Sequence, residues 1–179
     1  TGLGLTFDRD RRVMRFCTAA GIHWQEFQSN GVQRGRATRQ GWNRAWHQVM
    51  AAPLITPNLS RPTTLHQPLP QPLAGAQTRR LLRWNAHKPG CQHGGTQAAS
   101  SVLSSFLDSR AKRYQTSISK PEDSRHHCSR LSPHLAWGNL SLRQTYHALK
   151  HRQSDGEWGR ALAAFESRLH WHCHFIQKF

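Results

Sequence analysis

A run of prolines in the middle of the chain limits most strongly what this sequence can fold into. Six of the nine prolines lie between Pro53 and Pro72, among Thr, Ser, Gln and Leu. Proline has no backbone N–H group and a fixed φ, so neither a helix nor a sheet ladder can run through this stretch. We therefore expect an interdomain linker over residues 53–85, with structured segments over residues 1–52 and 86–179.

The segment before the linker carries the pattern of a helix followed by a short strand. Apolar side chains at helical spacing in residues 8–20 precede a glycine typical of a helix end: Val13, Met14, Phe16, Cys17 and Gly21. Residues 22–27 alternate apolar and polar side chains, which predicts a strand, and Asn30-Gly31 predicts a turn. Because helix and strand alternate in α/β sheets, we interpret residues 1–52 as the tail of an α/β domain.

Helical spacing dominates the rest of the chain. A short helix over residues 41–51 is predicted by one apolar stripe: Trp42, Trp46, Val49 and Met50. After the linker we expect Thr96 to be the N-cap of a helix whose apolar face continues to Tyr114 and includes these residues: Ala98, Ala99, Val102, Leu103, Phe106 and Leu107.

The C-terminal third is predicted to be a loop followed by three helical segments. The loop covers residues 116–127, and a helical turn covers residues 131–137. Ser141 is expected to cap the next helix, and a last helix runs from about Glu157. Its predicted buried face consists of Leu162, Phe165, Leu169 and Ile176. The sequence therefore predicts a mainly α fold.

The chain is strongly basic, with a formal net charge of +16 over 179 residues. Such a charge attracts polyanions, and nucleic acid is the natural candidate, although acidic partners elsewhere in a longer protein would explain it equally well. The four cysteines lie far apart, which favours a reducing cytoplasm over a disulfide framework or zinc ribbon. Neither a signal peptide nor a run of about 20 apolar residues is present, so we expect no membrane span.

The segment from Cys128 to Gln144, CSRLSPHLAWGNLSLRQ, carries the strongest local signal. Ser129 and Ser132 can donate hydroxyl hydrogens to phosphate oxygens, Arg130 supplies positive charge, and a helix start adds backbone N–H donors. The alternative is an ordinary N-cap, which serine pairs ahead of helices form more often than anion sites.

This segment resembles the signature Thr-Ser-x-Leu-Ser-Pro-x-Leu-x-x-Gly-x-Leu-Ser-x-Arg of photolyases and cryptochromes. The matching positions are Ser129, Leu131, Ser132, Pro133, Leu135, Gly138, Leu140, Ser141 and Arg143. Upstream, Gly94-Gly95 and the following apolar run to Tyr114 are similar to the start of the family's flavin domain. Downstream, FESRLHWHCHF over residues 165–175 resembles a tryptophan-containing helix of the family, so the resemblance covers about half of the chain.

The resemblance implies a fold, a cofactor and site residues. Residues 1–52 would be the tail of the N-terminal α/β domain, and residues 86–179 the truncated first part of the helical FAD-binding domain. Both ends of the chain are then expected to be cuts, with weak or no FAD retention and exposed apolar surface on the final helices. FAD would be held by Tyr114, Ser129, Arg130, Leu131 and Ser132, and the DNA lesion would meet Arg168 and Trp171.

Three positions depart from the family pattern. Cys128 stands where the family usually has threonine, and a thiol is the weaker donor to phosphate. Arg168 replaces a substrate-contacting glutamate, and His172 replaces the arginine after the tryptophan. The missing carboxylate weakens the case for pyrimidine-dimer repair in particular.

The function implied is FAD-dependent, blue-light-driven repair of pyrimidine lesions in DNA. We expect DNA as the partner, no association with a membrane, and a monomeric protein. A cryptochrome-type light receptor on the same scaffold is one alternative, and a basic nucleic-acid-binding protein without flavin is another. Histidines and cysteines near residues 126–128 and 170–174 are potential metal ligands, but His170 and His174 share a helix face that His172 does not. At most a two-ligand half-site is expected there, so we assign no metal.

Overall fold

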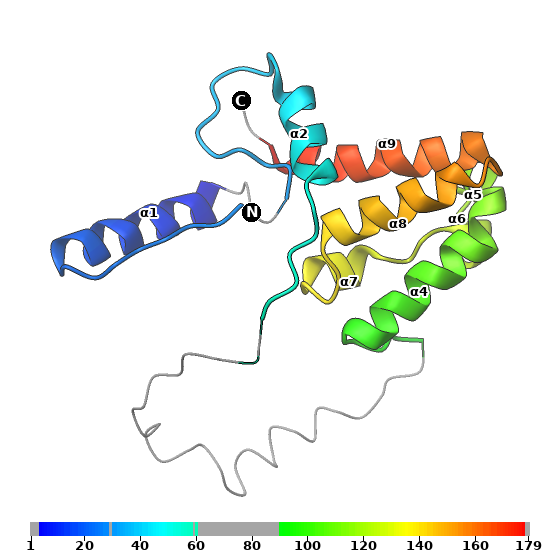
Figure 1. Ribbon diagram of the computed structural model, residues 1–179, viewed down its shortest axis with the longest axis horizontal. Helices are drawn as coiled ribbons and strands as arrows, with labels where there is room; N and C mark the ends of the chain where they lie inside the picture. Colours follow the sequence, from blue (N-terminus) through cyan, green and yellow to red (C-terminus); the bar gives the residue numbers. More distant parts are fainter. Residues whose placement is uncertain (1–3, 29, 59, 61–89, 178–179) are drawn as a thin grey trace, which may run out of the picture. The chain divides into compact units, whose positions relative to one another are not determined.

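The computed structural model describes residues 4–28, 30–58, 60 and 90–177, and in these residues it is helical without any strand. This confirms the mainly α fold class. The elements, shown in Figure 1, are α1 (Gly4–Ala19), α2 (Trp42–Ala51), α4 (Thr96–Asp108), the 3-10 helix η2 (Arg110–Arg113), α5 (Tyr114–Ser117), α6 (Pro121–His127), α7 (Ser132–Ala136), α8 (Leu142–Ser154) and α9 (Gly159–Ile176).

The chain divides into two compact units. One joins Thr1–Leu54 with Gly94–Phe179, and the other is Ile55–His93. The predicted proline-rich linker lies mostly in residues 61–89, outside the described residues. Within the first unit, α8 runs beside α9, and α4, η2 and α5 pack against them (Figure 1).

A single apolar core joins α2, α4, η2, α5, α8 and α9 of the first unit. Its buried side chains are Trp42, Trp46, Met50, Ala99, Leu103, Phe106, Leu107, Ala111, Tyr114, Leu131, Leu140, Leu142, Tyr146, Leu149, Ala161, Leu162, Phe165, Leu169 and Cys173. The predicted stripes of α2 and α4 and most of the predicted face of α9 are therefore confirmed. On α9 the last predicted position is different, because Ile176 is half-buried while Cys173 is completely buried.

The helix predicted to run from Thr96 towards Tyr114 is interrupted at Ser109. Ser109 has φ −145° and ψ −51°, and its hydroxyl donates to the carbonyl oxygen of Ser105 at 3.0 Å. Such a side-chain bond competes with the helical ladder, and a 3-10 turn follows. Thr96 is also not the N-cap, because Gly95 holds that position and Thr96 is the first helical residue.

The loop predicted over residues 116–127 is wrong for most of its length, since it contains the end of α5 and all of α6. Helix α6 begins with Pro121, whose missing N–H is not needed in a first turn. Glu122 and Asp123 follow in the first turn, and the last turn is basic. This charge order complements the helix dipole and would have identified the helix.

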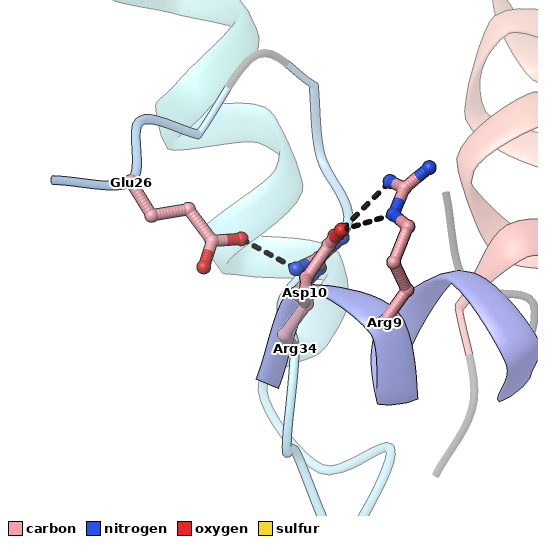
Figure 2. Close-up of polar contacts among 4 residues, drawn as sticks. All are labelled: Arg9, Asp10, Glu26 and Arg34. Atoms are coloured by element: carbon pink, nitrogen blue, oxygen red, sulfur yellow. Dashed lines mark hydrogen bonds and ion pairs between the residues drawn. The ribbon is translucent and has the colours of Figure 1, made fainter. Parts of the chain in front are cut away.

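The strand predicted over residues 22–27 is not formed, so the α/β interpretation of residues 1–52 is not supported in the described part of the chain. A strand needs a partner to complete its hydrogen bonds, and Ile22 and Phe27 remain 53% and 76% exposed. Ion pairs hold this segment instead. Arg34 contacts Asp10 at 2.6 Å and Glu26 at 2.8 Å, while Arg9 also binds Asp10 (Figure 2).

The helix predicted over residues 8–20 is confirmed as α1, and Gly21 follows it at φ +66°. Its apolar stripe is mostly not buried, however. Val13, Met14 and Phe16 are exposed, and only Cys17 is buried. The helical spacing thus predicted the element correctly but not its burial.

Helix α2 joins the early part of the chain to the C-terminal helices. Trp46 packs edge-on against Tyr146 of α8, with ring centroids 5.6 Å apart, and Trp42 lies 4.8 Å from His170 of α9. Gly31 packs so tightly against Trp46 that an added Cβ would lie 1.9 Å from the indole ring. Only glycine therefore fits at this position.

Candidate functional site

The backbone between α6 and α7 has the geometry of an anion-binding concavity. Arg130 has φ +60°, in the left-handed region, and Leu131 follows with φ −88° and ψ −12° in the right-handed helical region. Two successive residues of opposite hand form a nest, in which neighbouring N–H groups converge on one point. We call residues 129–132 the nest loop.

Three backbone N–H groups of the nest loop, those of Ser129, Leu131 and Ser132, have no acceptor among the described residues. Ser132 is the first residue of α7, where an N–H group has no partner within the helix. Leu131 is only 1% exposed, so its side chain anchors the loop in the core while its backbone stays available.

The N-cap alternative for the two serines is wrong. The N-cap of α7 is Leu131, and neither Ser129 nor Ser132 caps the helix with its side chain. Ser129 is half-buried and Ser132 is exposed, and within the described part of the chain both hydroxyls lack a hydrogen-bond partner. Two hydroxyl donors therefore stand beside the free N–H groups.

Arg110 of η2 binds the loop from its inner side. Its guanidinium donates to the carbonyl oxygens of Cys128 and, at 3.4 Å, Ser129. The same group binds the Val102 carbonyl of α4 at 2.8 Å. No carboxylate among the described residues pairs with it; burial and the nearby positive charge of Arg130 both lower the pKa of Arg110. Arg110 thus places beside the loop a positive charge that no carboxylate among the described residues pairs with.

Tyr114 lies beside the loop, at the first residue of α5. Its ring packs edge-on against Phe106 and Phe165, with centroids 5.4 and 5.7 Å away. Burial raises the pKa of Tyr114 to about 12; Cys128 adds to the rise, and Arg168 opposes it. Tyr114 of α5, Cys128 just before the nest loop and Arg168 of α9 therefore lie in one neighbourhood.

Cys128, at the position that departs from the family pattern, is half-buried. Burial raises the pKa of its thiol, and this outweighs the opposing effect of Arg110 and Arg130. The group is therefore a neutral thiol at physiological pH, able to give only a weak hydrogen bond to an anion. The weaker hydrogen bond to phosphate expected at this position stays a prediction.

The two proposed lesion-contacting residues lie together on the exposed side of α9. The Arg168 guanidinium lies 5.7 Å from the centre of the Trp171 ring, and Trp171 is 44% exposed. Trp171 also contacts Phe175 at 5.3 Å, and Phe175 is 74% exposed. The exposed apolar surface predicted for the final helices is thus confirmed.

The histidines of α9 take part in packing. His170 lies between the rings of Trp42 and Trp46, 4.8 and 4.9 Å from them, and its pKa is lowered by burial and by nearby positive groups. Among the described residues, no three His, Cys, Asp or Glu side chains converge in a way that could hold a metal ion. All four cysteines are free.

Sequence reasoning missed Arg110. Its partners at Cys128 and Ser129 lie 18 and 19 residues further along the chain, so no local pattern marks it. The only signal is its place one turn after Phe106, over whose ring its guanidinium lies at 5.5 Å.

Comparison of the chain with protein-family models, with curated proteins and with solved structures found no match. No described helix has the length and apolar character needed to cross a membrane.

Proposed function

We propose that this chain carries the phosphate-binding part of an FAD site in a flavoprotein of the photolyase and cryptochrome type. The observation that supports this most directly is the nest loop. The N–H groups of Ser129, Leu131 and Ser132 have no described acceptor, and they lie beside Arg110, whose guanidinium pairs with no described carboxylate. The signature residues Ser129, Leu131 and Ser132 all belong to this loop.

A pyrophosphate suits such a loop chemically. Backbone N–H groups and hydroxyls donate to phosphate oxygens, and charge-assisted bonds of this kind are about twice as strong as neutral ones. Arg130 and Arg110 add positive charge, and the buried ring of Tyr114 forms an apolar wall beside the loop. These residues bind and orient the cofactor, while the chemistry belongs to the flavin.

DNA is the proposed partner. When bound and reduced, FAD in such proteins supplies an electron to a pyrimidine lesion under blue light and receives it back after the cross-link breaks. The net charge of +16 favours association with a polyanion. Arg168 and Trp171 offer a cation and an exposed ring for a flipped-out base. Because Arg168 replaces a glutamate of the family pattern, a light-sensing role without dimer repair is the second candidate.

The proposal is tested by titrating the 179-residue chain with FAD and following flavin fluorescence, with ADP and riboflavin as competitors. We expect ADP to displace FAD and riboflavin to fail, because only ADP carries the pyrophosphate. The double variant Ser129→Ala/Ser132→Ala should weaken FAD binding at least about tenfold, since it removes two donors to a charged group.

The matched control is Ser100→Ala/Ser167→Ala, which removes two exposed hydroxyls from α4 and α9. It should leave FAD binding unchanged. Because weak FAD retention is expected of residues 1–179, equal binding by riboflavin and FAD, or an FAD affinity unchanged in the Ser129→Ala/Ser132→Ala variant, would contradict the phosphate-site assignment. Repair of an irradiated oligonucleotide under blue light would then separate a repair enzyme from a light receptor.

A further inference from the structure

One face of α1 carries three exposed arginines, Arg11, Arg12 and Arg15. Residues three and four positions apart are neighbours on a helix surface, so Arg15 lies beside both of the others. Among the described residues, no carboxylate forms an ion pair with any of the three. Like charges at this spacing repel each other, so the face would be stabilised by an anionic partner.

The segment that follows α1 lies against a different side of the helix. Arg34 contacts Asp10 of α1 at 2.6 Å and Glu26 at 2.8 Å, so Asp10 marks the side that faces this segment (Figure 2). Cys17, seven residues after Asp10 and therefore on the same side, is buried. The three arginines lie on the remaining circumference of α1, which is open to solvent.

A large aromatic side chain is exposed among these arginines. Phe16 follows Arg15 directly and lies one turn after Arg12, and it is 66% exposed. A ring left in water contributes nothing to the stability of the fold. Proteins that hold single-stranded nucleic acid combine cationic groups for the backbone phosphates with aromatic rings on which bases stack. In a duplex the bases are already stacked and paired, so the ring favours an unpaired strand.

The pattern of the helix argues against other anionic partners. A helix that lies in a bilayer surface needs one continuous apolar face, whereas Met14 and Phe16 are two positions apart and so lie on opposite sides of α1. An acidic polypeptide would pair with the arginines but would offer the ring no flat partner. A nucleic-acid strand supplies both, and the net charge of +16 favours its approach.

We propose that the α1 arginine face, formed by Arg11, Arg12, Arg15 and Phe16, binds single-stranded nucleic acid. The guanidinium groups contact backbone phosphates, for which their planar fork is well suited, and a base stacks on the ring. The face uses none of the residues proposed to hold FAD or the lesion, so the inference goes beyond the proposed function and does not rest on it.

The first test titrates a fluorescent oligothymidylate of about 20 residues at several salt concentrations. The variant is Arg11→Gln/Arg12→Gln/Arg15→Gln. Each phosphate contact in a single strand contributes about 0.7 to the slope of log K against log salt concentration, so we expect the slope to fall by about 2 and the affinity about tenfold or more. Glutamine is a good helix former, so the circular dichroism spectrum should not change.

The matched control is Arg113→Gln/Arg125→Gln/Arg160→Gln. It removes three exposed arginines of η2, α6 and α9 that also pair with no described carboxylate, and it should change the slope and the affinity much less. Equal losses in the two triple variants, or no binding by the unmodified chain, would overturn the proposal. Asp8→Asn, one turn before Arg12, should strengthen binding about twofold, a gain that unfolding cannot produce.

A second test addresses the ring. Phe16→Leu should weaken oligothymidylate binding about fivefold or more, because it removes the stacking surface. Phe27→Leu, at a similarly exposed phenylalanine outside α1, should leave binding unchanged. If a duplex binds as tightly as the single strand, or if polyglutamate displaces the oligonucleotide equally well, the face binds polyanions by charge alone and the proposal is wrong. FAD binding should be the same in the arginine triple variant and the unmodified chain, so this inference and the proposed function fail separately.

Discussion

Two helix starts in one short segment use serine in opposite ways. At the start of α8, Ser141 accepts from the N–H of Gln144 at 3.1 Å, and the Gln144 side chain accepts from the N–H of Ser141 at 2.8 Å. At the start of α7, Ser132 makes no such bond and the N-cap is the buried Leu131. One start satisfies its own polar groups, and the other leaves them exposed.

The difference shows how similar local sequences acquire different roles. A capping box completes the donors of a helix from within and contributes only stability. A nest with unused donors contributes little stability, and the left-handed conformation of Arg130 costs about 1–2 kcal/mol. Conformations of this kind persist where the surrounding structure holds them, often at functional sites. The start of α7 is therefore the better candidate for ligand binding.

The largest effect is expected where the nest loop meets the core. Leu131→Ala should lower the free energy of unfolding by about 2–5 kcal/mol, because Leu131 is almost fully buried. Leu140→Ala, before the capping box of α8, should cost a similar amount. In the folded fraction, only Leu131→Ala should also weaken FAD binding, since only Leu131 anchors the nest. Urea unfolding and FAD titration measure the two quantities, and equal binding losses would break the comparison.

A smaller effect separates the serines themselves. Ser141→Ala should lower the free energy of unfolding by about 1 kcal/mol through loss of the cap, without changing FAD binding. The Ser129→Ala/Ser132→Ala variant should change stability by less than about 0.5 kcal/mol, because its hydroxyls have no partner to lose. A large destabilisation of the double variant would show that these serines are structural.

A further effect is a dependence of stability on alkaline pH. The pKa of Tyr114 is raised from 10.0 to about 12, mainly by burial, so the folded chain keeps a proton that the unfolded chain loses. Stability from this group is complete below pH 10 and falls as the pH rises towards about 12. Urea unfolding from pH 9.5 to 12 should show this fall, and Tyr114→Phe should reduce it. Equal slopes in both proteins would contradict the assignment.

Helical periodicity predicted most elements of the C-terminal region because those helices bury one face each. The stripes of α2, α4 and α9 are examples, and the cap at Ser141 was predicted from a local motif. The break at Ser109 was missed because a single side-chain bond decides it. Helix α6 was missed because its evidence lies in proline and charge order, not in apolar spacing.

The candidate site was predictable only in part. Ser129, Leu131 and Ser132 were found through a sequence signature, but the left-handed conformation of Arg130 and the bonds of Arg110 depend on tertiary contacts. The prediction of a strand over residues 22–27 was wrong because a local pattern was present without the tertiary contact that it needs. Its alternating pattern is local, whereas a strand requires a neighbour that the described residues do not provide.

The packing of α2 and the segment before it against α8 and α9 has a consequence for folding during synthesis. The side chain of Gln177 exchanges two hydrogen bonds with the backbone of Gln33, 144 residues away. The ring of Trp42 likewise packs against His170 near the end of the chain. At about 5–20 residues per second, synthesis of the intervening chain takes roughly 7–30 s. During most of that time the aromatic partners of Trp46 and Trp42 on α8 and α9, Tyr146 and His170, have not yet been synthesised. We therefore expect the N-terminal segment to expose apolar side chains early in synthesis.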